Sequence, residues 1–320
     1  MGQMAAKVWG TQQRAVEEIF FQNEAVSLCL LVNRRARTMR VIDFRAGPTH
    51  AKRLFVLSLA QREGMSKVYT LVERDELSTW VKLGFAKEGN IPGFYKRSDA
   101  FLLGCSATPT QGTRKPAPPV EPEEIPIQSE MRLAVASGSV PLSAAQERME
   151  RTIAAAKRGL KDGADALPHA KIAPAGDAPV RKAISAALRS GRALTGFEPF
   201  GRDVERRHFM VTLRGGFELY ASIESQECFS NAFLEVLQSP RAEGEKVGTA
   251  AAIRALCDRL VAEGVVSCFS LAPSDDVALA SAYLQNGFRR TGLLQQHLLV
   301  RGERKDAIVW SRKLANPADE

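Results

Sequence analysis

Residues 80–85 read WVKLGF and residues 283–288 read YLQNGF, so the chain repeats one short pattern. Each copy has an aromatic residue, three residues that end a helix, and a Gly-Phe pair that opens a strand. Around each copy the hydrophobic pattern predicts the same order of elements: apolar strand, helix, apolar strand, short helix. A repeat of this size predicts two related domains, and differences between the copies then indicate which domain could carry out chemistry.

The first unit is predicted within residues 1–105, where apolar segments alternate with turn-forming residues. Gly64 follows the expected long helix and is typical of a helix C-terminus. The predicted elements are strands at 25–33 and 38–44, a helix ending near Glu63, a strand at 68–72, a short helix at 75–83 and two closing strands.

The second unit is predicted within residues 208–316 and repeats this order. Its expected elements are a hairpin at 209–213 and 217–223, a strand at 231–237, a helix at 249–262, a strand at 265–271, a helix at 275–286 and two closing strands. Residues 106–207 are rich in Pro and Ala, which is typical of a linker. A capping box at 143–146 and a basic segment at 181–192 predict one or two helices in this linker, packed on a domain.

The composition is that of a globular protein with an excess of basic residues. Of the 320 residues, 45% are hydrophobic and 25% charged, and the net charge of +8 favours anionic partners such as a phosphorylated cofactor. No apolar run reaches membrane-spanning length and the N-terminus does not resemble a secretory signal, so we expect no membrane partner and a cytoplasmic location. The five cysteines form no CxxC pair and the four histidines are scattered, so no metal site is predicted.

Nucleic-acid binding is a weaker alternative for the basic residues. Arg34, Arg35, Arg37 and Arg40 are clustered, and the segment 181–192 is basic. Both segments lack the aromatic residues on which bases stack, so nucleic acid is not the expected partner. A protein partner bound through 106–207 is a further expectation.

The order of elements and the spacing Tyr-x-x-x-Gly-Phe at 283–288 resemble the GNAT acetyltransferase superfamily. The resemblance implies an α/β (α+β) fold of two GNAT-like mixed-sheet domains in tandem, joined by a long, partly helical linker. It also implies acetyl-CoA as co-substrate, because in that fold a helix N-terminus binds the pyrophosphate.

A closer resemblance, to the beta-lysine N-acetyltransferase family, covers both units. In the first unit the matching text is MRVIDF at 39–44, AQREG at 60–64 and LGFAKEGNIPGFY at 83–95. In the second unit it is NGF at 286–288, TGL at 291–293 and VW at 309–310. The resemblance implies N-acetylation of a primary amine on a small molecule such as an amino acid.

The stretch PRAEGEKVG at 240–248 lies where the superfamily has its cofactor loop. Gly244 and Gly248 match the small residues that let the backbone approach the phosphates. Glu243 adds negative charge at that point, and Lys246 could offset it while crowding the loop. An ordinary charged turn before a helix is the alternative. By resemblance, the cofactor contacts fall to Val236, Leu237, Glu243, Gly244, Glu245, Lys246, Val247, Gly248, Thr249 and Asp276.

Acetyl transfer to an amine needs a base, a stabilised carbonyl oxygen and an acid for the departing thiolate. By resemblance Tyr283 is the candidate acid, or else an aromatic that packs the helix on the sheet. Glu235 is the candidate base, or else a partner for a basic residue, and the N–H of Val236 or Leu237 could polarise the carbonyl. The first unit has Trp80 at the tyrosine position, so we expect it to be non-catalytic.

Two function hypotheses follow. In the first, the second unit is an acetyl-CoA-dependent N-acetyltransferase. In the second, the chain is a non-catalytic GNAT-like interaction or regulatory protein, which the departures at Glu243 and Lys246 favour.

Overall fold

A computed structural model describes residues 3–6, 16–22, 27–43, 49–95, 98–107, 143–161, 167–226 and 229–315. The Pro-rich stretches at 116–119 and 121–124 lie outside the described residues. The described helices are α1 (His50–Arg62), α2 (Leu77–Lys82), α3 (Ala144–Lys161), α4 (Asp177–Arg189), α5 (Glu243–Ala262) and α6 (Val277–Gln285).

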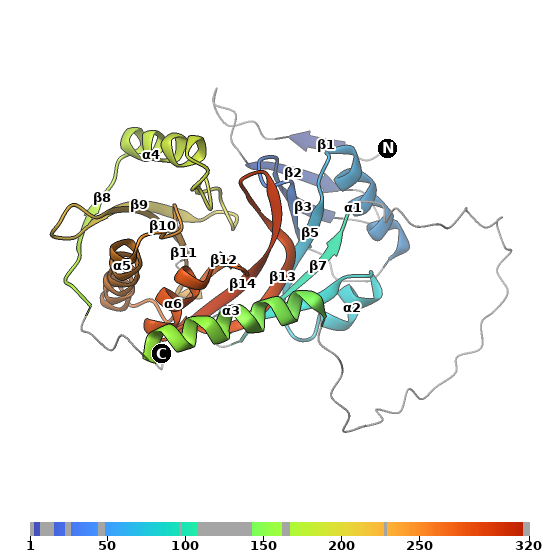
Figure 1. The fold of residues 1–320 in the computed structure, drawn as a ribbon. Coiled ribbons are helices and arrows are strands. Elements are labelled where there is room, and N and C mark those ends of the chain that lie inside the picture. The colour runs from blue at the N-terminus through green and yellow to red at the C-terminus, as the bar shows by residue number, and fades with distance from the viewer. Residues whose placement is uncertain are drawn as a thin grey trace, which may run out of the picture.

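The described strands form one sheet of 14 strands, in the order β1-β2-β3-β4-β5-β7-β6-β13-β14-β12-β11-β10-β9-β8 (Figure 1). In the first half they are β1 (Gln3–Ala6), β2 (Val16–Gln22), β3 (Ser27–Asn33), β4 (Thr38–Asp43), β5 (Lys67–Val72), β6 (Ala86–Ile91) and β7 (Ala100–Ser106). In the second half they are β8 (Lys171–Pro174), β9 (Glu205–Thr212), β10 (Glu218–Gln226), β11 (Asn231–Val236), β12 (Ser267–Pro273), β13 (Arg289–Val300) and β14 (Glu303–Lys313).

The strand order confirms the duplication. The first unit runs β2-β3-β4-β5-β7-β6 and the second runs β9-β10-β11-β12-β14-β13, which is the same topology. In each unit one pair is parallel, β4 with β5 and β11 with β12, and the other described pairs are antiparallel. The predicted mixed-sheet fold class is therefore confirmed.

The repeated sequence pattern adopts the same local structure twice. The rings of Trp80 and Phe85 meet edge to face at 5.0 Å, and those of Tyr283 and Phe288 at 5.1 Å. Each phenylalanine N–H donates to the carbonyl of the aromatic residue five positions earlier, at 3.1 Å in both units. The glycine between them has a positive φ in both units, which ends the helix and turns the chain into the strand.

The two units join through β6 and β13, which are the outermost strands at the facing edges of the two units. At this seam Gly89 lies opposite Gly292, and a Cβ built on Gly292 would stand 2.6 Å from the Gly89 Cα atom. Only glycine allows the two backbones to come this close. The units thus form one continuous sheet in addition to their covalent connection.

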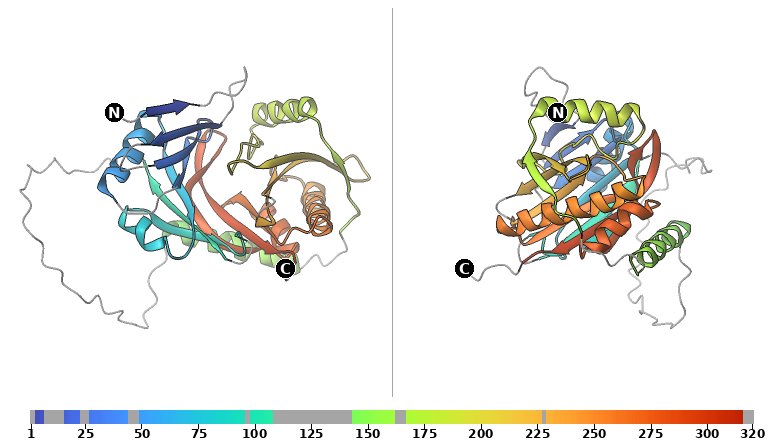
Figure 2. Two further views of the ribbon diagram at one scale, coloured as in Figure 1. Left: turned by 180° about the vertical axis from the view of Figure 1, so that it is seen from behind. Right: turned by 60° about the vertical axis from the view of Figure 1, so that its left-hand side comes forward.

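The described parts of 106–207 pack on the second unit. Helix α3 lies against α6, and β8 extends the sheet beside β9 (Figure 1). Helix α4 lies on the opposite side of strands β8–β11 from α5, where its Val180 and Ala187 pack near Leu237. Helices α1 and α2 cover the first unit, as the rear view in Figure 2 shows.

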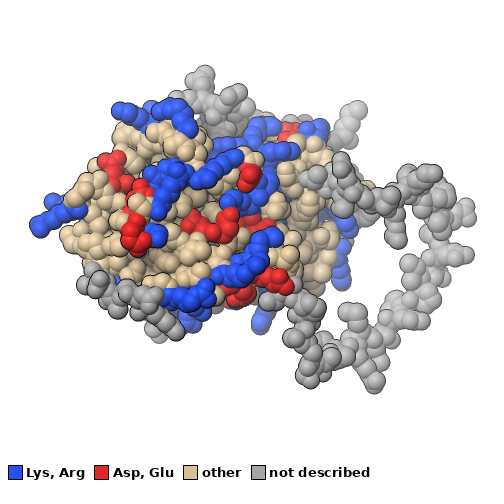
Figure 3. All heavy atoms as spheres, in the orientation of Figure 1, with Lys and Arg blue, Asp and Glu red and all other residues tan. Residues whose placement is uncertain are grey.

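The face of the sheet turned away from α5 and α6 carries an aromatic cluster shared by both units. Tyr69 and Phe94 from the first unit meet Phe233 and Phe269 from the second, and Phe200 packs among them. On the outer surface, basic and acidic side chains are interspersed over the face seen in Figure 3. Among the described helices, none is both long enough and apolar enough to cross a membrane.

Candidate functional site

The two parallel strands of the second unit separate part of the way along their length. Strands β11 and β12 are paired from Asn231 with Ser267 to Phe233 with Phe269. Beyond this point β11 continues beside β10 as far as Val236, and β12 continues beside β14. The sheet therefore opens between them, and no strand of the described residues pairs with this edge of β11 beyond Phe233.

A cavity of about 70 Å³ lies at this opening, on the face away from α5. Strand β11 contributes Glu235 and Val236, β12 contributes Leu271, and β13 contributes His297. The first unit supplies further walls, with Tyr69 and the β3–β4 turn at Arg35. The cavity is thus built from both units.

Among the residues that line this cavity, Glu235 has a pKa near neutral pH. Its Oε1 accepts from the Thr195 hydroxyl (2.7 Å), whereas its Oε2 is buried and has no hydrogen-bond partner. Burial raises the pKa of Glu235 from 4.5 to about 7, against the opposing effects of Arg206 and the Thr195 bond. A carboxyl group with such a pKa can both take up and release a proton at neutral pH.

The other carboxylates near the cavity already have ionic partners. Glu198 forms a two-point ion pair with Arg35 of the first unit, and Glu224 pairs with Arg206. Among the described carboxylates lining the cavity, Glu235 alone lacks a cationic partner.

The N–H groups of Val236 and Leu237, which were proposed to polarise the thioester carbonyl, point in different directions. The Leu237 N–H donates to the Tyr220 carbonyl (2.9 Å), so it already has a hydrogen-bond partner. Val236 pairs with Ala221 at the neighbouring, non-hydrogen-bonded position of the β10–β11 ladder. Its N–H therefore points away from β10, toward the open edge.

A second cavity, of about 750 Å³, lies between the N-terminus of α5 and the β9–β10 turn. Five of the predicted cofactor contacts line it: Gly244, Glu245, Val247, Gly248 and Thr249. Arg192 and Arg214 add positive charge to its wall. Glu243, Lys246 and Asp276 line neither this cavity nor the first.

The expected loop at 243–248 is in fact helix. Helix α5 begins at Glu243, six residues before the predicted start at 249, so these residues form its first turns. Lys246 is the first residue whose N–H donates within the helix, to Ala242. The N–H groups of the three residues before it are left for an external acceptor.

The charges at the start of α5 are balanced locally. Lys246 Nζ lies 2.7 Å from Glu243 Oε2, so the two departures from the superfamily pattern offset each other. Glu245 pairs with Arg192 (2.8 Å) and also accepts from the Arg241 N–H. The Lys246 side chain thus points to Glu243 instead of crowding the helix start.

The two glycines of this stretch have different surroundings. A Cβ on Gly248 would stand 2.6 Å from the Phe217 ring, so Gly248 is small because the β9–β10 hairpin packs against α5. A Cβ on Gly244 would meet nothing within 4 Å. Of the two, Gly244 is therefore the one that leaves open space at the helix N-terminus.

Asp276 and Tyr283 belong to α6. Asp276 caps the helix by accepting from the Leu279 N–H (2.9 Å) and also contacts the Ser239 hydroxyl. Tyr283 is fully buried and stacks on Trp310 at 5.7 Å, as the packing interpretation expects. Its hydroxyl shares a hydrogen bond of 2.5 Å with Ser270, which is the first residue of β12 beyond the pairing with β11. Neither Tyr283 nor Ser270 lines the first or the second cavity.

The segment that follows α4 is bonded to the residues that come directly after β11. Ala193 forms a bridge with Gln238, and the Leu194 N–H donates to the Leu237 carbonyl (2.9 Å). The sequence interpretation of 106–207 as a linker missed this contact, because no local pattern indicates which strand edge a loop will meet.

His297 was also missed as a site residue, because its place within an expected strand gives no sign of what it faces. It is buried, lines the first cavity, and meets the Tyr69 ring edge to face at 4.8 Å. Within the described ranges, no group of three or more His, Cys, Asp and Glu side chains is arranged to hold a metal ion.

No family model matches the chain, and no curated protein matches it. Among solved structures, it is similar to a spermidine N-acetyltransferase from Vibrio cholerae in complex with CoA and spermine, with a TM-score of 0.38 and 12% identity over 46% of this chain and 97% of that one. It is also similar to the ribosomal-protein-S18-alanine N-acetyltransferase from Escherichia coli, with a TM-score of 0.34 and 16% identity over 46% of this chain and 94% of that one. Each likeness spans a little under half of this chain.

Proposed function

We propose that the chain is an acetyl-CoA-dependent N-acetyltransferase whose second unit acts on a primary amine of a small molecule such as an amino acid. The observation that carries the proposal is Glu235, a carboxyl group with a pKa of about 7 in a cavity where β11 and β12 separate. The resemblance to the beta-lysine N-acetyltransferase family supports the same chemistry.

Acetyl-CoA supplies the acetyl group as a thioester. The start of α5 suits its diphosphate, since the N–H groups of residues 243–245 are free of helical bonds, Gly244 leaves space, and Arg192 and Arg214 lie alongside. The second cavity fits this ligand because small residues such as Gly244 and Gly248 line it, and its two arginines balance Glu218 and Glu245.

The two proton transfers of the reaction take place on opposite faces of the sheet, one at Glu235 and the other at Tyr283. Glu235 takes a proton from the amine in the first cavity, so that the nitrogen lone pair can form the new C–N bond. The Val236 N–H donates to the carbonyl oxygen as negative charge develops on it. Tyr283 gives its proton to the sulfur as the C–S bond breaks, from the helix side of the opening, and its burial raises the pKa so that the phenol stays protonated.

Calorimetric titration of the full chain with acetyl-CoA tests the proposal, together with a thiol assay for released CoA in the presence of a primary amine. We expect saturable binding and amine-dependent release. Gly244→Trp fills the open space at the start of α5 and should abolish binding, whereas Val261→Trp at the exposed far end of the same helix should not. Equal binding by both variants would contradict the assignment.

A second candidate function, a non-catalytic interaction protein, is favoured by one observation. Ala193 bridges Gln238 and the Leu194 N–H donates to the Leu237 carbonyl, so the chain directly after β11 already has a neighbouring segment. This proposal predicts that acetyl-CoA does not bind the wild-type chain at millimolar concentration. It also predicts that a variant without the contacts of Ala193 and Leu194 to Gln238 and Leu237 does not gain acetyltransferase activity.

A further inference from the structure

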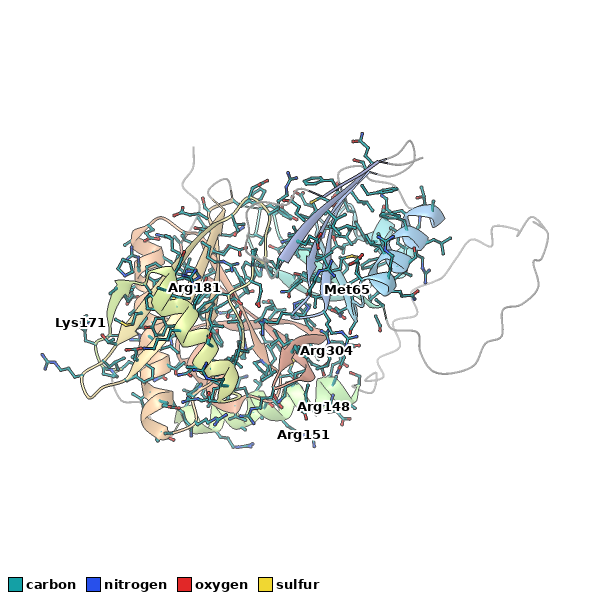
Figure 4. The ribbon with its side chains drawn as sticks, turned by 90° about the horizontal axis from the view of Figure 1, so that it is seen from above. Met65, Arg148, Arg151, Lys171, Arg181 and Arg304 are labelled. Carbon is teal, nitrogen blue, oxygen red and sulfur yellow. The ribbon has the colours of Figure 1, made fainter. Side chains whose placement is uncertain are left out.

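Thr195 lies in the segment between α4 and β9, outside both repeated units. This segment is fixed beside the end of β11, because the Leu194 N–H donates to the Leu237 carbonyl (2.9 Å). Figure 4 looks down on α4, where Arg181 is labelled, and shows this helix over the strands of the second unit. The chain that leaves the helix therefore buries Thr195 next to the strand that carries Glu235.

The hydroxyl of Thr195 has two hydrogen-bond partners. Its oxygen accepts from the Phe197 N–H (2.8 Å) and lies 2.7 Å from Glu235 Oε1. A hydroxyl carries one proton, and among the described residues this proton has no acceptor other than Glu235. If Oε1 itself carried the carboxyl proton, the buried Thr195 proton would have no acceptor, which is costly. The hydroxyl therefore donates to Oε1, and the carboxyl proton belongs on Oε2.

The turn that presents this hydroxyl is fixed by its own residues. Phe197 has a φ of 57°, which is uncommon for a residue with a side chain, and its N–H bond to Thr195 helps to hold it there. The Gly196 N–H donates to the Glu198 carboxylate (3.2 Å), which also pairs with Arg35 of the first unit. A Cβ on Gly196 would stand 2.6 Å from Glu198 Oε1, so a side chain there would displace this ion pair. The turn is therefore held from both units.

Among the described residues, Thr195 is the one hydrogen-bond donor to the Glu235 carboxyl. The charged groups around Glu235 already pair with one another: Arg35 with Glu198, and Arg206 with Glu224. The other titratable groups around it are neutral at pH 7, because burial raises the pKa of the phenols and lowers the pKa of the imidazole: Tyr69, Tyr283 and His297. The Thr195 hydroxyl is therefore what distinguishes one carboxyl oxygen of Glu235 from the other.

We propose that Thr195 is a positioning residue for Glu235. Its hydroxyl holds Oε1, so that Oε2, which is buried and without a partner, is the oxygen that takes up the proton lost by the amine nitrogen. The catalytic meaning of this arrangement rests on the proposed function, whereas the place of the carboxyl proton does not. Because Thr195 belongs to the segment between α4 and β9, a residue outside both repeated units completes the site.

The test compares Thr195→Val, which keeps the shape and removes the donor, with Thr195→Ser, which keeps the hydroxyl. On the full chain without acetyl-CoA, infrared difference spectroscopy measures the carbonyl stretch of protonated Glu235, with Glu235→Gln to assign the band. The pKa of the same carboxyl is measured by ¹³C NMR.

In wild type Oε1 is the carbonyl oxygen of the protonated acid and accepts from Thr195, so Thr195→Val should move the stretch to higher frequency. The same change should raise the pKa of Glu235 by about one pH unit, because the lost bond favours the ionised form. Thr195→Ser should restore both values. The acid limb of the kcat/KM profile should follow the measured pKa in each variant.

Thr152→Val is the matched control, since it removes a buried threonine hydroxyl that donates to the Arg148 carbonyl (3.2 Å) on α3, and it should change neither value. Thr195→Cys, a weaker donor, gives the same comparison if Thr195→Val does not fold. An unchanged carbonyl stretch or an unchanged pKa overturns the inference and leaves the proposed function in place. If both values move but no amine is acetylated, the proposed function fails and the placement of the proton stands.

Discussion

Replacing Glu235 by Gln should lower the activity strongly and yet stabilise the protein above neutral pH. The carboxyl has a pKa of about 7 in the folded chain, against 4.5 ordinarily. Between these values the folded carboxyl keeps its proton while the unfolded one has lost it, so the free energy of unfolding falls as the pH rises through this window. At about 1.4 kcal/mol per pH unit, the loss is complete above pH 7 and amounts to about 3 kcal/mol.

Glutamine cannot ionise, so Glu235→Gln removes this loss. The assay is urea unfolding of wild type and variant at pH 5 and pH 8, because the difference between the two pH values cancels any constant packing effect. We expect the variant to be more stable than wild type by about 1 kcal/mol at pH 5 and by about 3 kcal/mol at pH 8. Loss of the base should lower kcat about 10²- to 10⁴-fold.

The control is Glu303→Gln, which makes the same chemical change at an exposed position on β14. The reasoning is refuted if Glu235→Gln changes stability equally at pH 5 and pH 8. It is also refuted if the variant retains wild-type kcat for amine acetylation.

Three other variants test the seam, the imidazole and the phenol. Gly292→Ala puts a Cβ 2.6 Å from the Gly89 Cα atom and should cost about 1–3 kcal/mol in urea unfolding, whereas Gly159→Ala on exposed α3 should be neutral or stabilising; equal effects would count against the seam. His297 is neutral when folded, so wild type should lose about 2 kcal/mol as the pH falls from 6.5 to 5, and His297→Phe should not lose it; parallel pH profiles would contradict this assignment. Tyr283→Phe should cost about 1 kcal/mol in a melt and lower kcat at least 100-fold, and an unchanged kcat would leave only its packing role.

The repeated fold could be read from the sequence because its determinants are local. Trp80 and Tyr283 each lie in the last turn of a helix, five residues before a phenylalanine, and the intervening glycine makes the turn, so a short stretch contains all the information needed. Glu235 could be named as the candidate base because its position is also defined locally: it lies on the strand that enters the predicted cofactor loop at 240–248.

The features that sequence reasoning missed depend on contacts between distant residues. Helix α5 begins at Glu243 because Glu245 accepts from the backbone of Arg241, which a prediction based on apolar spacing does not register. Gly248 fits the Phe217 ring, which lies on another strand. His297 faces the cavity only because a bulge opposite Asp306 turns it, and the alternating pattern of a strand does not indicate a bulge.

A crystal structure with a bisubstrate ligand, in which coenzyme A is joined through its sulfur and an acetyl spacer to n-butylamine, tests the central claim most directly. The account predicts the diphosphate at the start of α5, the linker between β11 and β12, and the amine nitrogen within hydrogen-bond distance of Glu235 Oε2. A ligand bound elsewhere, or a chain that does not bind it at all, would contradict the account.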